Sequence, residues 1–219
     1  MQPYFLDRHD AGLRLAAALT KYADRPEVIV LALPRGGVPV AYEVAQELHV
    51  PLDVFLVRKL GVPGHEELAM GAIATGGVRI LDRHLIQMLG VGPDEIERVT
   101  ARELRELERR EILYRDNRPA PDVTGWTVIL VDDGLATGST MRAAVEALRR
   151  EGARSIVVAV PIAAPDTCES LRQEVDDIVC AVTPEPFRAV GIWYVDFSET
   201  SDQEVRDLLE RAALSNPRV

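Results

Sequence analysis

The residues with the clearest chemical potential lie between Val128 and Thr140, where the chain reads VILVDDGLATGST. Four apolar residues predict a buried strand that ends at Asp132 and Asp133. In an open α/β sheet, ligands bind beyond the carboxyl ends of the strands. Two adjacent carboxylates at such an edge repel each other and lose solvent, which is costly unless a ligand uses them. A vicinal diol suits both, because each carboxylate accepts hydrogen bonds from hydroxyl groups.

The small residues that follow predict an anion site. Gly134 and Leu135 lead into a short loop, and a helix is predicted from about Ser139 to Arg150. The loop residues are Ala136, Thr137, Gly138, Ser139 and Thr140. Free backbone N–H groups at a helix N-terminus, with hydroxyls and the helix dipole, favour a phosphate monoester. Each piece alone fits an acidic turn before a Ser/Thr-rich helix cap, but their order and spacing together predict a ribose 5-phosphate site.

Two basic segments are predicted at the same edge of the sheet. Pro34-Arg35-Gly36-Gly37 follows the first predicted strand, where glycines allow close backbone approach to an anion and Arg35 adds positive charge. Arg58 and Lys59 end the second predicted strand. The alternatives are a tight turn with a solvated arginine and a pair of surface cations.

Apolar runs that alternate with helical patterns predict an α/β fold with a mainly parallel central sheet. The five predicted strands are 28–33, 52–57, 126–131, 155–162 and 177–182. Helices are predicted at 11–22, 38–48, 139–150 and 202–214, with another between the last two strands. The whole chain, 1–219, is expected to form one domain.

One stretch departs from this alternation. Residues 61–77 are glycine-rich and predict a flexible loop, although 69–80 can form a hairpin around Thr75-Gly76-Gly77. A long charged helix is predicted over 94–115, with an apolar stripe and with charges such as Glu103 facing elsewhere. We expect a cap insertion at about 60–120, which covers the site or forms an oligomer contact, and a C-terminal hood at about 183–219.

VILVDDGLATGST resembles the binding signature of the type I phosphoribosyltransferases for 5-phosphoribosyl-1-pyrophosphate (PRPP). The resemblance implies that fold, with Asp132 and Asp133 on the ribose hydroxyls and 136–140 on the 5-phosphate. It also implies pyrophosphate binding by Arg35, Gly36 and Gly37, in a loop that often holds a cis peptide, and by Arg58 and Lys59. The segments PRGGVPVA and PEPF…WYxDF resemble an uncharacterised bacterial branch of predicted phosphoribosyltransferases.

The reaction implied by this resemblance joins a nitrogenous base or similar acceptor to C1 of PRPP and releases pyrophosphate. Arg35, Lys59, Asp132 and Asp133 are the expected catalytic residues, and Mg²⁺ is the expected cofactor, carried through PRPP. A non-catalytic regulator that binds PRPP or a nucleotide is the main alternative. A phosphohydrolase or phosphorylase acting on a ribose phosphate is a third hypothesis.

Aromatic residues near the C-terminus are candidates for acceptor binding. Phe187, Trp193 and Tyr194 can stack on a heterocyclic base, and packing under the last helix is the alternative for Trp193 and Tyr194. Asp196 resembles a carboxylate that lies near the metal in hypoxanthine-guanine phosphoribosyltransferases.

The bulk properties restrict the partners. A net charge of −10 argues against general nucleic-acid binding, which needs basic surface. Short apolar runs broken by charges argue against a membrane span, and no signal peptide is expected at the start. Cys168 and Cys180 show no metal-ligand spacing and are expected to be reduced thiols in a cytoplasmic protein. A homodimer is a further possibility.

Overall fold

The computed structural model describes residues 4–116 and 118–216. Its body is a five-stranded sheet in the order β2-β1-β6-β7-β8, with every neighbouring pair parallel. The strands are β1 Val28–Ala32, β2 Leu52–Val54, β6 Thr127–Val131, β7 Ser155–Ile162 and β8 Asp177–Val182. All residues of β1 and β6 are buried, as their unbroken apolar runs require. The predicted α/β class is confirmed, and the carboxyl ends of all five strands lie at one edge.

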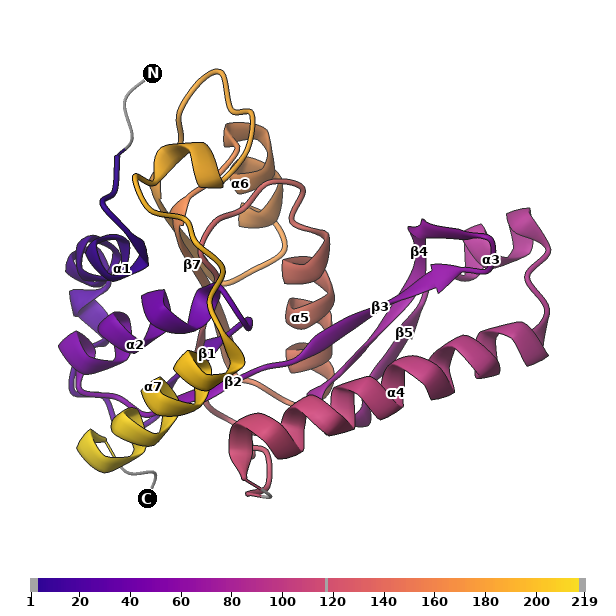
Figure 1. The fold of residues 1–219 in the computed structure, drawn as a ribbon, viewed down its shortest axis with the longest axis horizontal. Coiled ribbons are helices and arrows are strands. Elements are labelled where there is room, and N and C mark those ends of the chain that lie inside the picture. Colours follow the sequence, from indigo (N-terminus) through magenta and orange to yellow (C-terminus); the bar gives the residue numbers. More distant parts are fainter. Residues whose placement is uncertain (1–3, 117, 217–219) are drawn as a thin grey trace.

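Helices cover both faces of this sheet (Figure 1). Because side chains alternate along a strand, Val28 and Val30 of β1 face one hydrophobic core, and Ile29 and Leu31 face the other. The first core includes residues of α1 Arg8–Ala17, α2 Gly37–Leu48 and α7 Asp202–Ser215; the second includes residues of α5 Ser139–Arg150 and α6 Pro165–Arg172. A short 3-10 helix, η1 Thr20–Tyr22, follows α1.

Residues 57–115 form an arm that extends away from the body (Figure 1). It consists of an antiparallel sheet, a short helix and a long helix. These elements are β3 Val57–Val62, β4 His65–Ala74, η2 Thr75–Gly77, β5 Arg79–Leu81, α3 Arg83–Leu89 and α4 Pro93–Arg115. The predicted hairpin around 75–77 and the long helix are confirmed.

Two expectations for this region were wrong. The predicted strand 52–57 is divided: β2 belongs to the body and β3 to the arm. The predicted loop 61–77 is mostly strand, because apolar residues of β3 and β4 such as Leu60 and Met70 belong to the same core as Ile96 and Leu107 of α4. The apolar stripe of α4 supplies the face that a hairpin needs for stability.

The segment between β8 and α7, residues 183–201, is called the hood loop here. It contains a cis Glu185–Pro186 peptide and the 3-10 helix η3 Gly191–Trp193. Below it, a disulfide joins Cys168 of α6 to Cys180 of β8, so the expectation of two reduced thiols is corrected. The fold brings these two residues together, with Cα atoms 6.7 Å apart, from positions 12 residues apart in the sequence. Within the described residues, no helix is long and apolar enough to cross a membrane.

Candidate functional site

Asp132 and Asp133 lie directly after β6, at the carboxyl edge of the sheet. The backbone N–H of Asp133 donates to Oδ1 of Asp132 over 2.8 Å. Burial, reinforced by the neighbouring charge of Asp133, raises the pKa of Asp132 well above its ordinary value. Burial also raises the pKa of Asp133, and the Arg8 guanidinium opposes that rise. The two carboxylates are therefore held at a cost, which a ligand with hydroxyl groups can offset.

The Pro34–Gly37 loop lies against these carboxylates. A Cβ atom on Gly36 would stand 2.0 Å from Oδ2 of Asp133, and one on Gly37 would stand 2.9 Å from Cα of Asp132. Both glycines are thus required by close approach, with α2 starting at Gly37. The Pro34–Arg35 peptide is cis, which confirms the expectation drawn from the resemblance. The loop between β1 and α2 therefore packs directly against the acidic end of β6.

The predicted phosphate loop, 136–140, occupies the turn into α5. Gly138 has φ +73°, a left-handed conformation that favours glycine, and Ser139 begins the helix. The loop is anchored from α6 by Thr167 Oγ1, which donates to Ala136 O over 2.6 Å, and from α5 by Arg142 Nη1, which donates to Thr137 O over 2.9 Å. The side chains of Thr137 and Ser139 stay exposed. The first N–H groups of α5, which lack partners within the helix, are available to an anion.

Arg58 and Lys59 occupy β3, in the arm sheet, and point to opposite faces because successive strand residues alternate. Lys59 lines a cavity of about 560 Å³ between the arm and α5, together with Ser139 and Arg142. Arg58 instead turns to α4, where its Nε and Nη2 donate to Glu103 Oε2 over 2.9 and 2.6 Å. Lys59 thus faces the same cavity as Ser139 of the predicted phosphate loop, whereas Arg58 is paired with Glu103. It also corrects the expectation that Glu103 faces away, because this side chain is buried.

The family described as "Phosphoribosyl transferase domain" matches residues 7–191. This chain belongs to the phosphoribosyl transferase domain family. A Mycobacterium tuberculosis protein named "Putative phosphoribosyl transferase Rv0571c" is 45% identical over 208 residues, which are 95% of this chain and 47% of the relative. The chain therefore spans about half the length of this curated relative.

Solved structures share the fold of this chain. The protein TT1426 from Thermus thermophilus is 42% identical, with a TM-score of 0.84, over 96% of this chain and 99% of that one. The AQ2163 protein from Aquifex aeolicus shares only the fold: it is 14% identical with a TM-score of 0.51, over 92% of this chain and 83% of that one.

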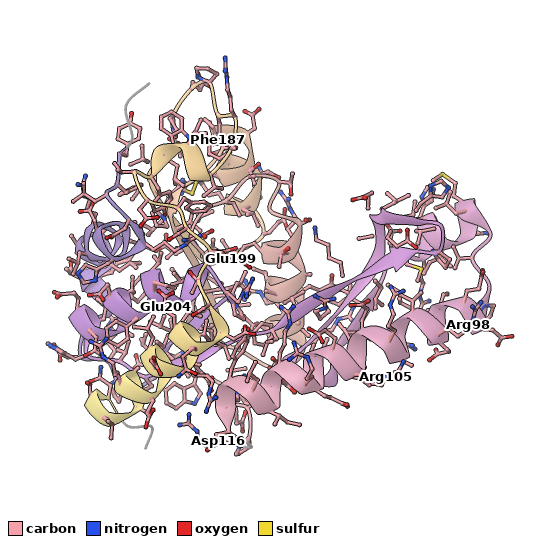
Figure 2. The ribbon with its side chains drawn as sticks, in the orientation of Figure 1. Arg98, Arg105, Asp116, Phe187, Glu199 and Glu204 are labelled. Carbon is pink, nitrogen blue, oxygen red and sulfur yellow. A yellow bond between two sulfur atoms is a disulfide. The ribbon has the colours of Figure 1, made fainter. Side chains whose placement is uncertain are left out.

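Within this phosphoribosyl transferase fold, Trp193 and Tyr194 are not open to a base. Only 3% and 4% of their surfaces are exposed, because they lie in a hydrophobic cluster with Phe5 and Ile162. Tyr194 contacts the backbone of the candidate site, since its hydroxyl donates to the backbone carbonyl of Asp133 over 2.6 Å. Packing, the alternative considered for these two residues, is what the structure shows. Phe187 is partly buried on the hood loop, far along the loop from Glu199 (Figure 2).

Asp196, the candidate metal ligand, is exposed, and its Oδ1 accepts a hydrogen bond from the Ser198 N–H over 2.9 Å. This contact lowers the pKa of Asp196. Within residues 4–116 and 118–216, no group of three His, Cys, Asp or Glu side chains could hold a metal ion. Mg²⁺ is commonly bound through one or two carboxylates together with the phosphates of a substrate.

Two arginine side chains make contacts at the site that the sequence did not predict. Arg8, from α1, binds Asp133 Oδ2. Arg35 forms an ion pair with Glu199 of the hood loop and lies 3.8 Å from Asp202 at the start of α7. The partners are at least 125 residues apart in the sequence. No spacing or motif signals pairs so distant, whereas the fold places the start of α1, the Pro34–Gly37 loop and the hood loop around the end of β6.

Proposed function

We propose that this protein is a PRPP-dependent phosphoribosyltransferase of the pentosyltransferase class, acting on a nitrogenous base or similar acceptor. The observation that carries the proposal is the approach of Gly36 and Gly37 to Asp133 and Asp132. A basic glycine loop and a carboxylate pair then face one ligand that carries both a pyrophosphate and a diol. Membership of the family supports the same function.

Each part of the site has a role in this proposal. Asp132 and Asp133 accept hydrogen bonds from the two ribose hydroxyls and position the sugar. The backbone N–H groups and hydroxyls of 136–140 bind the 5-phosphate at the start of α5. Lys59, the N–H group of Gly36 and, once its ion pair with Glu199 opens, Arg35 bind the pyrophosphate. The N–H of Gly37 instead donates to the carbonyl of Leu33 over 3.1 Å. Arg58, engaged by Glu103, contributes to the pyrophosphate site only if that ion pair opens.

The proposed reaction breaks the bond between C1 of PRPP and the pyrophosphate oxygen and forms a bond from C1 to the acceptor nitrogen. Pyrophosphate leaves with the bonding electrons, and positive charge develops at C1. Asp132 and Asp133 favour that charge through their negative field, while Arg35 and Lys59 favour the leaving group. Mg²⁺ bound to the pyrophosphate would offset part of the leaving group's charge.

We further propose that the arm and the hood loop frame the acceptor within a single domain. Exclusion of water matters for this reaction, because water competes with the acceptor for C1. Phe187 is the hood-loop aromatic residue that remains a candidate for the base, since Trp193 and Tyr194 are buried.

The test measures pyrophosphate release from PRPP and Mg²⁺ with a panel of purine and pyrimidine bases, together with PRPP affinity by calorimetry. We expect release with at least one acceptor. The double variant Asp132→Asn/Asp133→Asn should weaken PRPP binding at least about tenfold, because two charged acceptors are lost. Asp207→Asn, on the exposed face of α7, is the matched control.

Two results would contradict the proposal in different ways. Unchanged PRPP affinity in the double variant would refute the site. Tight PRPP binding without pyrophosphate release for any base would refute the transferase and favour the alternative, a regulator that binds PRPP.

A further inference from the structure

Arg8 makes more contacts at the site than its place near the N-terminus suggests. Its Nε and Nη2 lie 2.9 and 2.8 Å from Oδ2 of Asp133. Its Nη1 donates to the carbonyl of Ser198 in the hood loop over 2.7 Å, and its guanidinium stacks 4.0 Å from the centre of the Phe197 ring. One side chain thus connects α1, the end of β6 and the hood loop.

Arg8 contacts only one of the two carboxylate oxygens of Asp133. The Nε hydrogen bond and the Nη2 ion-pair contact of Arg8 both reach Oδ2, the oxygen that a Cβ on Gly36 would also meet. Among the described residues, no residue other than Asp133 itself donates a hydrogen bond to its Oδ1. When one oxygen of a carboxylate is held in place, the plane of the group and the direction of its other oxygen are also fixed. A planar guanidinium holds this orientation firmly, because its contacts to the carboxylate are charge-assisted.

We infer that Arg8 is a positioning residue that holds Asp133 through Oδ2, so that Oδ1 is presented as a charged acceptor to a ribose hydroxyl. The inference rests on the proposed function for the identity of the ligand. The side chain of Arg8 is 12% exposed and that of Asp133 is 16% exposed, so water screens this pair weakly.

The charged and titratable groups around Asp133 explain why a cation is needed there. Asp132 precedes it on the end of β6, Arg8 faces it from α1, and the Tyr194 hydroxyl lies behind it on the backbone carbonyl. Burial favours the protonated form of Asp133, and Arg8 is the cation that opposes this effect. Without Arg8, the carboxyl should keep its proton to higher pH and lose its fixed orientation.

The experiment measures PRPP affinity with Mg²⁺ by calorimetry from pH 6 to pH 9 for wild type, Arg8→Gln and Arg8→Lys. The control is Arg14→Gln, on the same helix, where Arg14 forms an exposed pair with Asp10. At pH 7, we expect Arg8→Gln to bind PRPP at least about tenfold more weakly. The loss should shrink as pH rises, because a higher pH favours the ionised form of Asp133. The PRPP affinity of Arg8→Lys should lie between those of wild type and Arg8→Gln, because an ammonium group supplies the charge without the planar geometry of a guanidinium.

The outcomes separate the inference from the proposed function. If wild type and Arg14→Gln bind PRPP and Arg8→Gln binds it equally well at every pH, Arg8 has no positioning role. A purely structural role would lower the melting temperature of Arg8→Gln without changing the pH dependence, and that result also overturns the inference. If wild type fails to bind PRPP, the proposed function fails. The role of Arg8 is then tested by following the ¹³C resonance of the Asp133 carboxyl as the pH is changed. If Asp133 titrates identically in wild type and Arg8→Gln, the inference that Arg8 positions Asp133 is overturned. If the titration moves to higher pH in Arg8→Gln, the inference is supported.

Discussion

Gly36 shows how one residue determines whether the two halves of the site can meet. Its φ of −60° is open to any residue, so the requirement for glycine is steric. A methyl group there would stand 2.0 Å from Oδ2 of Asp133, closer than any non-bonded contact allows. The carboxylate or the loop would have to move, and Arg8, 3.3 Å from the same point, limits the space for movement.

The substitution Gly36→Ala should therefore weaken PRPP binding at least about tenfold and lower the free energy of unfolding by about 1–3 kcal/mol, as overpacking does. Calorimetric titration and urea denaturation measure the two effects. Gly92→Ala is the control, because a Cβ there would lie 3.8 Å from its nearest neighbour. If Gly36→Ala binds PRPP like wild type, the loop and the carboxylates do not act on a common ligand.

At the scale of elements, the Arg58–Glu103 pair attaches β3 to α4. Oε2 of Glu103 accepts two bonds from Arg58, and Oε1 accepts a bond from Arg102 Nε over 2.9 Å. The acid is buried on a helix whose other charges mostly lie outside. The arm sheet is small, so its position on α4 depends strongly on such contacts.

Removal of the acid by Glu103→Ala should cost about 2 kcal/mol of unfolding free energy, because it leaves a partly buried guanidinium without its acceptor. Urea denaturation checks this value. Glu108→Ala, on the exposed side of the same helix, should have little effect. Equal losses in both variants would show that the ion pair adds nothing beyond helix propensity.

At the scale of the whole molecule, the arm joins the body through buried charges at its base. Arg115, at the end of α4, lies 3.2 Å from Asp53 Oδ1 and donates to the carbonyl of Val54 over 2.6 Å. Burial lowers the pKa of Arg115. Nearby Glu151 is the C-cap residue of α5, and its Oε1 would lie 2.4 Å from a Cβ on Gly76 of the arm. Burial, reinforced by the charges of Glu111 and Asp122 and opposed by that of Arg115, raises the pKa of Glu151 to about 7.

This pKa makes stability depend on pH in a definite direction. The unfolded chain releases the Glu151 proton near the ordinary value of 4.5, while the folded protein keeps it to about 7. The folded state binds more protons in this window, so its stability falls as pH rises from about 4.5 to about 7. Glu151→Gln should be more stable than wild type by about 1–2 kcal/mol at pH 8, discounted for a half-exposed group, and equal to it near pH 4.

Urea denaturation at pH 4 and pH 8 measures the difference between Glu151→Gln and wild type. Glu47→Gln, exposed on α2, should show no gain that depends on pH. If Glu151→Gln gains the same free energy of unfolding at both pH values, the effect comes from packing against the arm and not from ionisation.

Local patterns in the sequence were enough to predict much of the fold. The helix 139–150 and the strands 155–162 and 177–182 have the predicted bounds, because apolar periodicity and turn residues act over a few neighbouring positions. The placement of Asp132, Asp133 and the 136–140 loop at a strand end and a helix start was predictable for the same reason. The roles assigned to these residues stay predictions until the ligand experiments are done.

Local patterns could not predict contacts between distant segments. The division of 52–57 into β2 and β3 depends on which sheet each half joins, and the direction of Arg58 depends on a buried acid 45 residues away. The burial of Trp193 and Tyr194 and the Cys168–Cys180 disulfide likewise exist only after the chain has packed. The sequence by itself determined which residues stand at the carboxyl ends of the strands. Only the tertiary structure decided that Arg8, 125 positions away, holds Asp133, because an ion pair forms wherever folding places opposite charges within reach.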